Sequence, residues 1–115
     1  HGALAEFAGV VRPTSKSGRE VTHLFYEAYE AMAVAKLQLC LDLAHSRWKL
    51  LDAAVVHRLG PLELGDVAVS IAVSSKHRNE AFEACRFIID HIKEIVPIWK
   101  KETGPDGSEW ISGGA

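Results

Sequence analysis

The most constraining feature of this sequence is an alternating strand pattern followed at once by a helical pattern. Valine and isoleucine occupy every second position from Val67 to Val73, which predicts a strand. From Asn79 to about Ile95 the apolar residues recur at helical spacing, and Pro97 is expected to end that helix. A strand and a helix in such close succession indicate a fold in which helices pack against a sheet.

The other segments extend this pattern along the chain. We expect strands over residues 2–11, 21–29 and 53–59, a helix over 30–48, and a hairpin over 98–111 that turns at 104–107. Gly60-Pro61 is predicted to end the third strand, residues 64–66 to form a turn, and residues 13–20 to form a mobile polar loop. A wide apolar arc on helix 30–48 predicts that much of its circumference is covered. The order predicts an α+β fold with two main helices on a largely antiparallel sheet.

Composition excludes several classes of protein. The chain has 115 residues and no linker, which predicts one domain over residues 1–115. A net charge of -2 argues against a nucleic-acid-binding protein, although a local cationic pocket is compatible with it. No apolar run approaches the roughly 20 residues that span a membrane. Cys40 and Cys85 fall within apolar helical patterns, so we expect buried free thiols and a reducing, cytoplasmic environment.

The first candidate site is the pair His77 and Arg78, between the predicted strand and the predicted helix. Such a junction presents unpaired backbone N–H groups and the positive end of the helix dipole, which suit a phosphate or another anion. The alternative is a solvated basic loop in which Ser75 caps the helix. Arg12, at the end of the first strand, is a further candidate, and its alternative is an ordinary exposed arginine.

The second candidate site is the pair Lys93 and Lys100, which flank the chain reversal at Pro97. The reversal would bring both ammonium groups toward one cleft. The alternative is that Lys93 caps the helix end and Lys100 decorates an edge strand. Lys100 and Lys101 are neighbours on a predicted strand, so one can face a pocket while the other faces away.

Other kinds of site are not indicated by the sequence. The histidines are scattered without ligand-like spacing to a cysteine, so we expect no metal, and we expect no cofactor. His57, within a predicted strand, is expected to be structural. The sequence also lacks the glycine-rich loop of nucleotide-binding proteins and the serine elbow of hydrolases.

Seven motifs in order, with a closing Asp-Gly and tryptophan, resemble the large, catalytic subunit family of molybdopterin synthase. Together they cover nearly the whole chain. The motifs are Phe7-x-Gly9-x-Val11-Arg12, residues 26–33, Arg47-Trp48, residues 57–60, Ser74-Ser75-x-His77-Arg78, residues 81–85 and residues 97–102, followed by Asp106, Gly107 and Trp110.

The resemblance implies a sulfurtransferase of molybdenum cofactor biosynthesis with an α/β-hammerhead-type α+β fold. The family converts cyclic pyranopterin monophosphate to molybdopterin and takes sulfur from the thiocarboxylated C-terminal glycine of a small ubiquitin-like subunit. Two large subunits form a central dimer, with a small subunit at each end, giving a heterotetramer. The sulfur transfer in the family needs no metal. The rival interpretation is a non-catalytic dimeric module that binds an anion or a phosphorylated metabolite.

The resemblance also assigns roles to individual residues. Lys93 and Lys100 fall on the family's catalytic lysines, and substrate contacts fall on seven further residues: Val10, Val11, Arg12, His77, Arg78, Lys101 and Glu102. Relative to the family, the segment before the first strand is missing and the C-terminal tail is short, so we expect a domain with reduced extensions at both ends.

Overall fold

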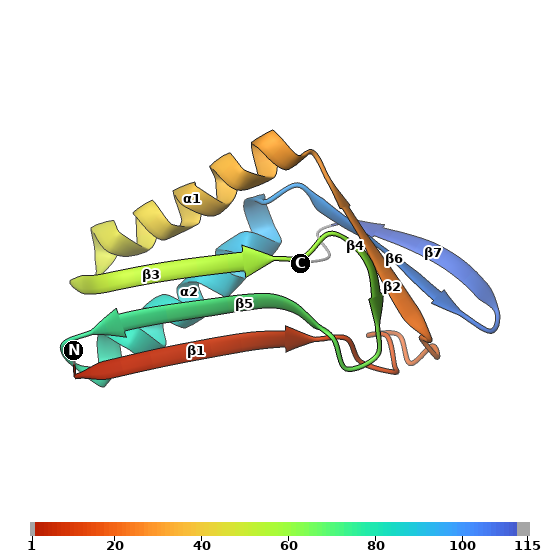
Figure 1. The fold of residues 1–115 in the computed structure, drawn as a ribbon, viewed down its shortest axis with the longest axis horizontal. Coiled ribbons are helices and arrows are strands. Elements are labelled where there is room, and N and C mark those ends of the chain that lie inside the picture. Colours follow the sequence, from red (N-terminus) through yellow and green to blue (C-terminus); the bar gives the residue numbers. More distant parts are fainter. Residues whose placement is uncertain (1, 113–115) are drawn as a thin grey trace.

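The structure, a computed structural model, describes residues 2–112 and has the elongated shape seen in Figure 1, about 48 × 26 × 20 Å. The last residues of the predicted short tail, 113–115, lie outside the described residues. The elements are β1 (Ala3–Val10), β2 (His23–Ala28), α1 (Glu30–Arg47), β3 (Leu50–His57), β4 (Gly60–Glu63), β5 (Val67–Ser75), α2 (Arg78–Ile95), β6 (Ile98–Gly104) and β7 (Gly107–Ser112).

The described strands form two separate antiparallel sheets, one with the order β1-β5-β3 and the other with the order β4-β2-β6-β7. The second sheet lies across one end of the first (Figure 1). The predicted α+β class and the C-terminal hairpin are therefore confirmed. The sequence patterns do not reveal the division into two sheets, because periodicity identifies strands but not their partners.

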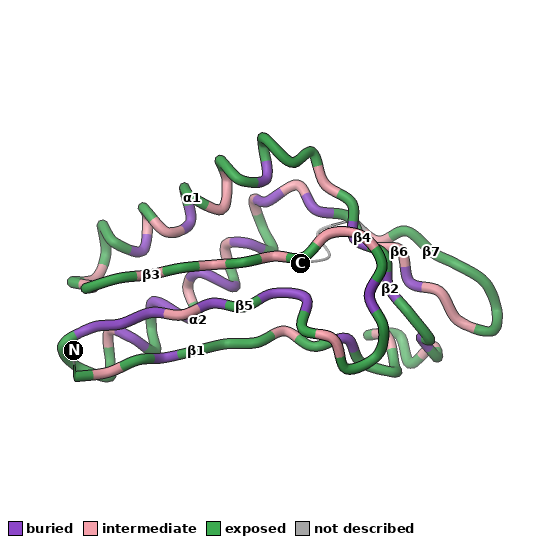
Figure 2. Tube along the Cα trace, in the orientation of Figure 1, coloured by how far each residue is buried: buried purple, intermediate pink, exposed green. Residues whose placement is uncertain are grey.

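The core lies between the three-stranded sheet and α2, which packs against β5 and β1. Ile71 and Val73 on β5 and Ile88 and Ile92 on α2 are fully buried members of this core. Figure 2 shows buried residues along both elements. Each such side chain contributes roughly 1.5–3 kcal/mol by leaving water. Fixing α2 in this way also fixes its last turn, and therefore the position of any functional group that the turn carries.

The region 50–63 differs from its prediction. β3 begins at Leu50, and Gly60-Pro61, expected to end a strand, instead begins the short strand β4, which pairs with β2. Gly60 adopts a φ of +86°, a conformation that glycine tolerates and that lets the chain turn from β3 into β4. Pro61 is acceptable because β4 is an edge strand, where a missing N–H need not break a ladder.

The prediction that much of the circumference of the first helix is covered is wrong for a single chain. α1 buries Ala33, Cys40 and Ala44, whereas Met32 and Val34 stay more than half exposed. The physical reason is that, among the described residues, α1 packs mainly against α2 and β3, which leaves its outer flank exposed. The buried, unpaired state predicted for the two cysteines is confirmed, and burial raises the pKa of both thiols.

Replacing Ile92 with alanine tests the packing that positions the end of α2. Ile92→Ala should lower the free energy of unfolding by about 2–5 kcal/mol, because it leaves a cavity where the fully buried isoleucine side chain was. Chemical denaturation measures this loss. Glu94→Ala, an exposed position on the same helix, is the matched control and should change stability by no more than about 0.5 kcal/mol. Equal losses in the two variants would contradict the proposed packing.

Candidate active site

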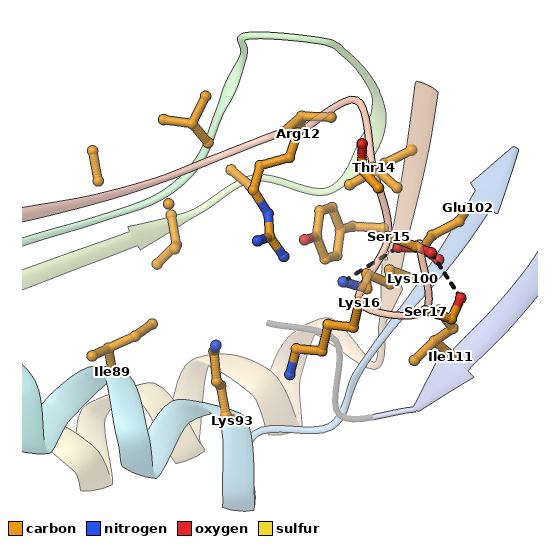
Figure 3. Close-up of a pocket in the computed structure, with 18 of the residues that line it drawn as sticks. Arg12, Thr14, Ser15, Lys16, Ser17, Ile89, Lys93, Lys100, Glu102 and Ile111 are labelled. Atoms are coloured by element: carbon orange, nitrogen blue, oxygen red, sulfur yellow. Dashed lines mark hydrogen bonds and ion pairs between the residues drawn. The ribbon is translucent and has the colours of Figure 1, made fainter. Parts of the chain in front are cut away.

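A pocket of about 780 Å³ opens where the two sheets meet, beside the C-terminal end of α2 (Figure 3). Its volume falls in the range of sites for small-molecule ligands. The wall comes from both sheets, from α2 and from the loop after β1. The lining residues are Phe7, Ala8, Gly9, Val10, Val11, Arg12, Thr14, Ser15, Lys16, Ser17, Leu24, Tyr26, Ala68, Val69, Ile89, Lys93, Lys100, Glu102, Glu109 and Ile111.

Three predicted cationic residues from distant parts of the sequence line this pocket. Arg12 lies two residues after the end of β1, Lys93 lies in the last turn of α2, and Lys100 lies on β6. Their side chains point toward one hollow in Figure 3. Because Pro97 reverses the chain between α2 and β6, the two lysines reach the pocket from adjoining walls, as the sequence predicts.

Lys100 occupies the most enclosed position among these cations. Its side chain is 18% exposed, and its Nζ lies 3.7 Å from Oε2 of the buried Glu102 carboxylate. Burial lowers the pKa of the Lys100 amine; the Glu102 charge opposes this shift, and the charges of Lys16, Arg12 and Lys93 reinforce it. Such an amine exchanges its proton more readily near neutral pH than a solvated lysine does, which suits acid–base chemistry.

The other predicted substrate contacts, on β1, just after it and on β6, do not all face the pocket. Val10, Val11 and Glu102 line the pocket together with Lys100. Lys101 does not line it; its Nζ lies 5.9 Å from the centre of the Trp110 ring. The predicted opposition of Lys100 and Lys101 is therefore confirmed, and it places Lys101 away from the hollow of its own chain.

His77 and Arg78 are not brought to the pocket within one chain. His77 is the N-cap residue of α2 and Arg78 its first residue, whereas Lys93 is in the last turn of the same helix. The intervening helix is about 22 Å long at 1.5 Å per residue, a distance that an arginine side chain cannot span. Ser75 does not cap the helix with its side chain; its hydroxyl donates to the His77 carbonyl oxygen.

Lys16 and Tyr26 are among the pocket residues that the sequence did not predict. Lys16 belongs to the loop predicted as mobile, and no periodic pattern connects that loop to a pocket; a basic residue shortly after Arg12 was the only signal. Tyr26 pairs with Lys100 across the β2–β6 ladder, and its side chain is buried. Burial raises the pKa of its hydroxyl, and the Glu102 charge raises that pKa further, so the phenol stays neutral.

His57 lies behind the pocket rather than in it, which fits the structural role expected for it. Its ring meets the Tyr26 ring edge-on, with the ring centres 4.9 Å apart. Its Nδ1 lies 2.7 Å from the Arg58 carbonyl oxygen, so Nδ1 carries the proton and donates it. Burial lowers the pKa of the imidazole, which keeps the ring neutral beneath the tyrosine.

The described residues contain neither a metal-binding cluster nor a membrane-spanning helix. In the range 2–112, no group of three or more histidine, cysteine, aspartate and glutamate side chains is arranged to hold a metal ion. No helix in that same range is both long and apolar enough to cross a membrane.

Comparison with known proteins finds relatives of this chain that are similar in sequence and in structure. Residues 1–95 match the sequence profile of the MoaE protein family. The molybdopterin synthase catalytic subunit of Staphylococcus carnosus is 50% identical over 96% of this chain and 73% of its own length. The crystal structure of molybdopterin synthase from Staphylococcus aureus matches with a TM-score of 0.90 and 48% identity, over 96% of this chain and 80% of that one.

A more distant structure shares the fold alone. It is a protein–protein complex of subunits 1 and 2 of the molybdopterin-converting factor from Helicobacter pylori. The match has a TM-score of 0.76 and 23% identity, over 95% of this chain and 70% of that one.

The fold, the cationic pocket and these relatives define a catalytic subunit of the sulfurtransferase class. The predicted enzyme class is confirmed, and the relatives give no support to the rival non-catalytic module. The chain belongs to the MoaE family, whose curated relatives are molybdopterin synthase catalytic subunits that act in molybdenum cofactor biosynthesis.

The protonation of Lys100 can be measured directly. Because burial disfavours its charged form, its pKa should lie below that of a solvated lysine. Glu102→Gln removes the carboxylate that favours the charged form, so the pKa should fall further. Titration of the lysine side-chain carbons by NMR measures both values. A pKa that rises in Glu102→Gln would contradict the electrostatics described here.

Proposed function

We propose that this chain converts cyclic pyranopterin monophosphate to molybdopterin, with sulfur supplied by the thiocarboxylated C-terminus of a small ubiquitin-like subunit. The observation that carries the proposal is the enclosed Lys100 amine, which lines one pocket together with Lys93 and Arg12. Both reactants are anionic, so bringing them together requires fixed positive charge in a partly water-free site. Curated relatives that are 43–50% identical carry the name of this enzyme.

Lys100 and Lys93 are the proposed catalytic residues. In its neutral form, the Lys100 amine can accept a proton during addition to the substrate. In its charged form, it can stabilise negative charge that develops on an oxygen atom. Lys93 lies in the last turn of α2, where its charge is favourable beside the helix C-terminus, and it faces the same hollow. Arg12 is placed to hold the phosphate, with Val10, Val11 and Glu102 as neighbouring substrate contacts.

A small subunit is the proposed sulfur donor in this pocket. The Helicobacter pylori structure with the same fold contains two subunits of the molybdopterin-converting factor. The pocket of about 780 Å³ has room for a substrate beside a narrow C-terminal tail, and its cations would attract a terminal thiocarboxylate. We place the resulting complex, a heterotetramer of two large and two small subunits, in the cytoplasm.

A second copy of the chain is the proposed source of His77 and Arg78 for each pocket. One chain cannot bring this pair to Lys100, whereas a symmetric dimer can place the start of one α2 near the pocket of the other chain. Met32 and Val34 on α1 and Leu4 and Val56 on the three-stranded sheet leave apolar surface available for such a contact. Lys101 retains its proposed substrate role only if it acts across a subunit boundary, because it faces away from its own pocket.

Removing the amine of Lys100 tests the catalytic proposal. Lys100→Ala should reduce molybdopterin formation by at least about a thousandfold while the fold persists, because the lost group serves both proton transfer and charge stabilisation. A single-turnover assay with thiocarboxylated small subunit measures this. Lys93→Ala should show a comparable loss, and Lys49→Ala, an exposed lysine outside the pocket, should retain activity. Near-normal turnover in Lys100→Ala would remove this residue from the mechanism.

Mixing two inactive variants tests the shared site. Lys100→Ala and Arg78→Ala chains should each be impaired alone, but one of the two sites in a mixed dimer would contain both intact residues. Random mixing of equal amounts should therefore restore about a quarter of wild-type activity. Mixing Lys100→Ala with Lys93→Ala chains is the control, because these residues share one pocket and no intact site can form. Absence of recovery in the first mixture, with mixed dimers present, would refute a site built across the dimer.

A further inference from the structure

The loop 13–20 is fixed over the pocket by a clamp centred on Arg19. The Arg19 guanidinium contacts the Asp106 carboxylate at 3.2 Å and the Glu109 carboxylate at 2.7 Å. It also donates to the carbonyl oxygens of Glu102 and Gly107, each at 3.0 Å. Its side chain is only 18% exposed, and all four contacts lie on the β6–β7 hairpin, so the loop is attached to the sheet that carries Lys100.

Backbone hydrogen bonds within the same loop also fix its shape. The backbone N–H of Ser15 donates to the Arg19 carbonyl oxygen at 2.8 Å, and that of Val21 donates to the Pro13 carbonyl oxygen at 2.8 Å. Gly18, with a φ of +86°, forms the tight turn at the tip. Lys16 is therefore held on a defined loop, and Figure 3 shows its ammonium group extending into the hollow toward Lys93.

The charges around Lys16 are unfavourable unless an anion is present. Lys16 lines the pocket beside three other cations, and its charge acts on Lys100 strongly enough to lower the pKa of that amine. Within residues 2–112, the Lys16 side chain forms no ion pair or hydrogen bond. Two carboxylates are among the described residues that line the pocket: Glu109 is bound by Arg19, and Glu102 lies beside Lys100. Arg19 holds the loop so that the Lys16 ammonium group extends toward other cations. This arrangement indicates a binding site for an anionic group.

We propose that Lys16 is a substrate-binding residue that contacts the phosphate group of the pterin substrate together with Arg12. Arg12 immediately precedes the loop 13–20 and Lys16 lies within it, so they can approach a single phosphate from the same wall of the pocket. This inference rests on the proposed function. Arg19 does not touch the substrate; it is a positioning residue that acts through the loop.

Substrate affinity provides the test. Lys16→Gln should weaken binding of cyclic pyranopterin monophosphate by about tenfold, because a charge-assisted contact is lost. Lys16→Arg should restore most of the affinity, and Lys49→Gln, outside the pocket, is the control for loss of one positive charge. Calorimetry on the assembled complex measures these constants, with inorganic phosphate as a second probe that should show the same order of affinities.

The outcomes separate this inference from the proposed function. Wild-type molybdopterin formation in the same preparation tests the function by itself. Substrate affinity in Lys16→Gln within twofold of the Lys49→Gln value would overturn the inference, and so would a loss confined to affinity for the thiocarboxylated subunit. In an Arg19→Ala background, Lys16→Gln should have a clearly smaller effect, because the loop is already released. Full additivity of the two changes would overturn the positioning role of Arg19.

Discussion

Four positively charged side chains gather at the junction of the two sheets, and the surrounding fold has to hold them there against their mutual repulsion. Arg12, Lys16, Lys93 and Lys100 line one pocket, and within the described part of the chain Glu102 is the carboxylate paired with Lys100. The positive charges repel one another, and this repulsion is stronger where water is partly excluded. The fold must therefore hold them by other means. The necessary rigidity comes from the burial of α2 against β5, from the ladder between β2 and β6, and from the contacts of Arg19.

Helix α2 has two chemically different ends, and the proposed site uses both. Its C-terminal turn carries Lys93, where the helix dipole favours positive charge by about 0.3–1 kcal/mol. Its N-terminal turn presents free backbone N–H groups beside His77 and Arg78, an arrangement suited to anions. The helix separates these ends by more than 20 Å. A two-fold dimer is the simplest arrangement in which both kinds of end could serve one substrate.

The sequence predicts the parts of this structure that local periodicity encodes. The alternation at Val67–Val73 and the helical spacing up to Ile95 place β5 and α2 nearly correctly, and Pro97 marks the reversal that brings Lys93 and Lys100 together. β4 was missed because Gly60-Pro61 ordinarily ends a strand, and only pairing with β2 makes one there. Lys16 was missed because its placement depends on contacts of Arg19 with residues 87 and 90 positions away. No local pattern carries such long-range information.

The electrostatics of the pocket also connect substrate binding to the proton on Lys100. Tyr26 stays neutral and Glu109 is engaged by Arg19. Among residues 2–112, Lys100 therefore has the Glu102 carboxylate beside it and feels the charges of Lys16, Arg12 and Lys93. An anion bound among those cations offsets their repulsion and favours the charged amine, which raises the pKa that burial had lowered. Lys100 therefore holds its proton more firmly when a phosphate is present. In the proposed mechanism, a bound substrate phosphate would shift Lys100 from accepting a proton toward stabilising negative charge.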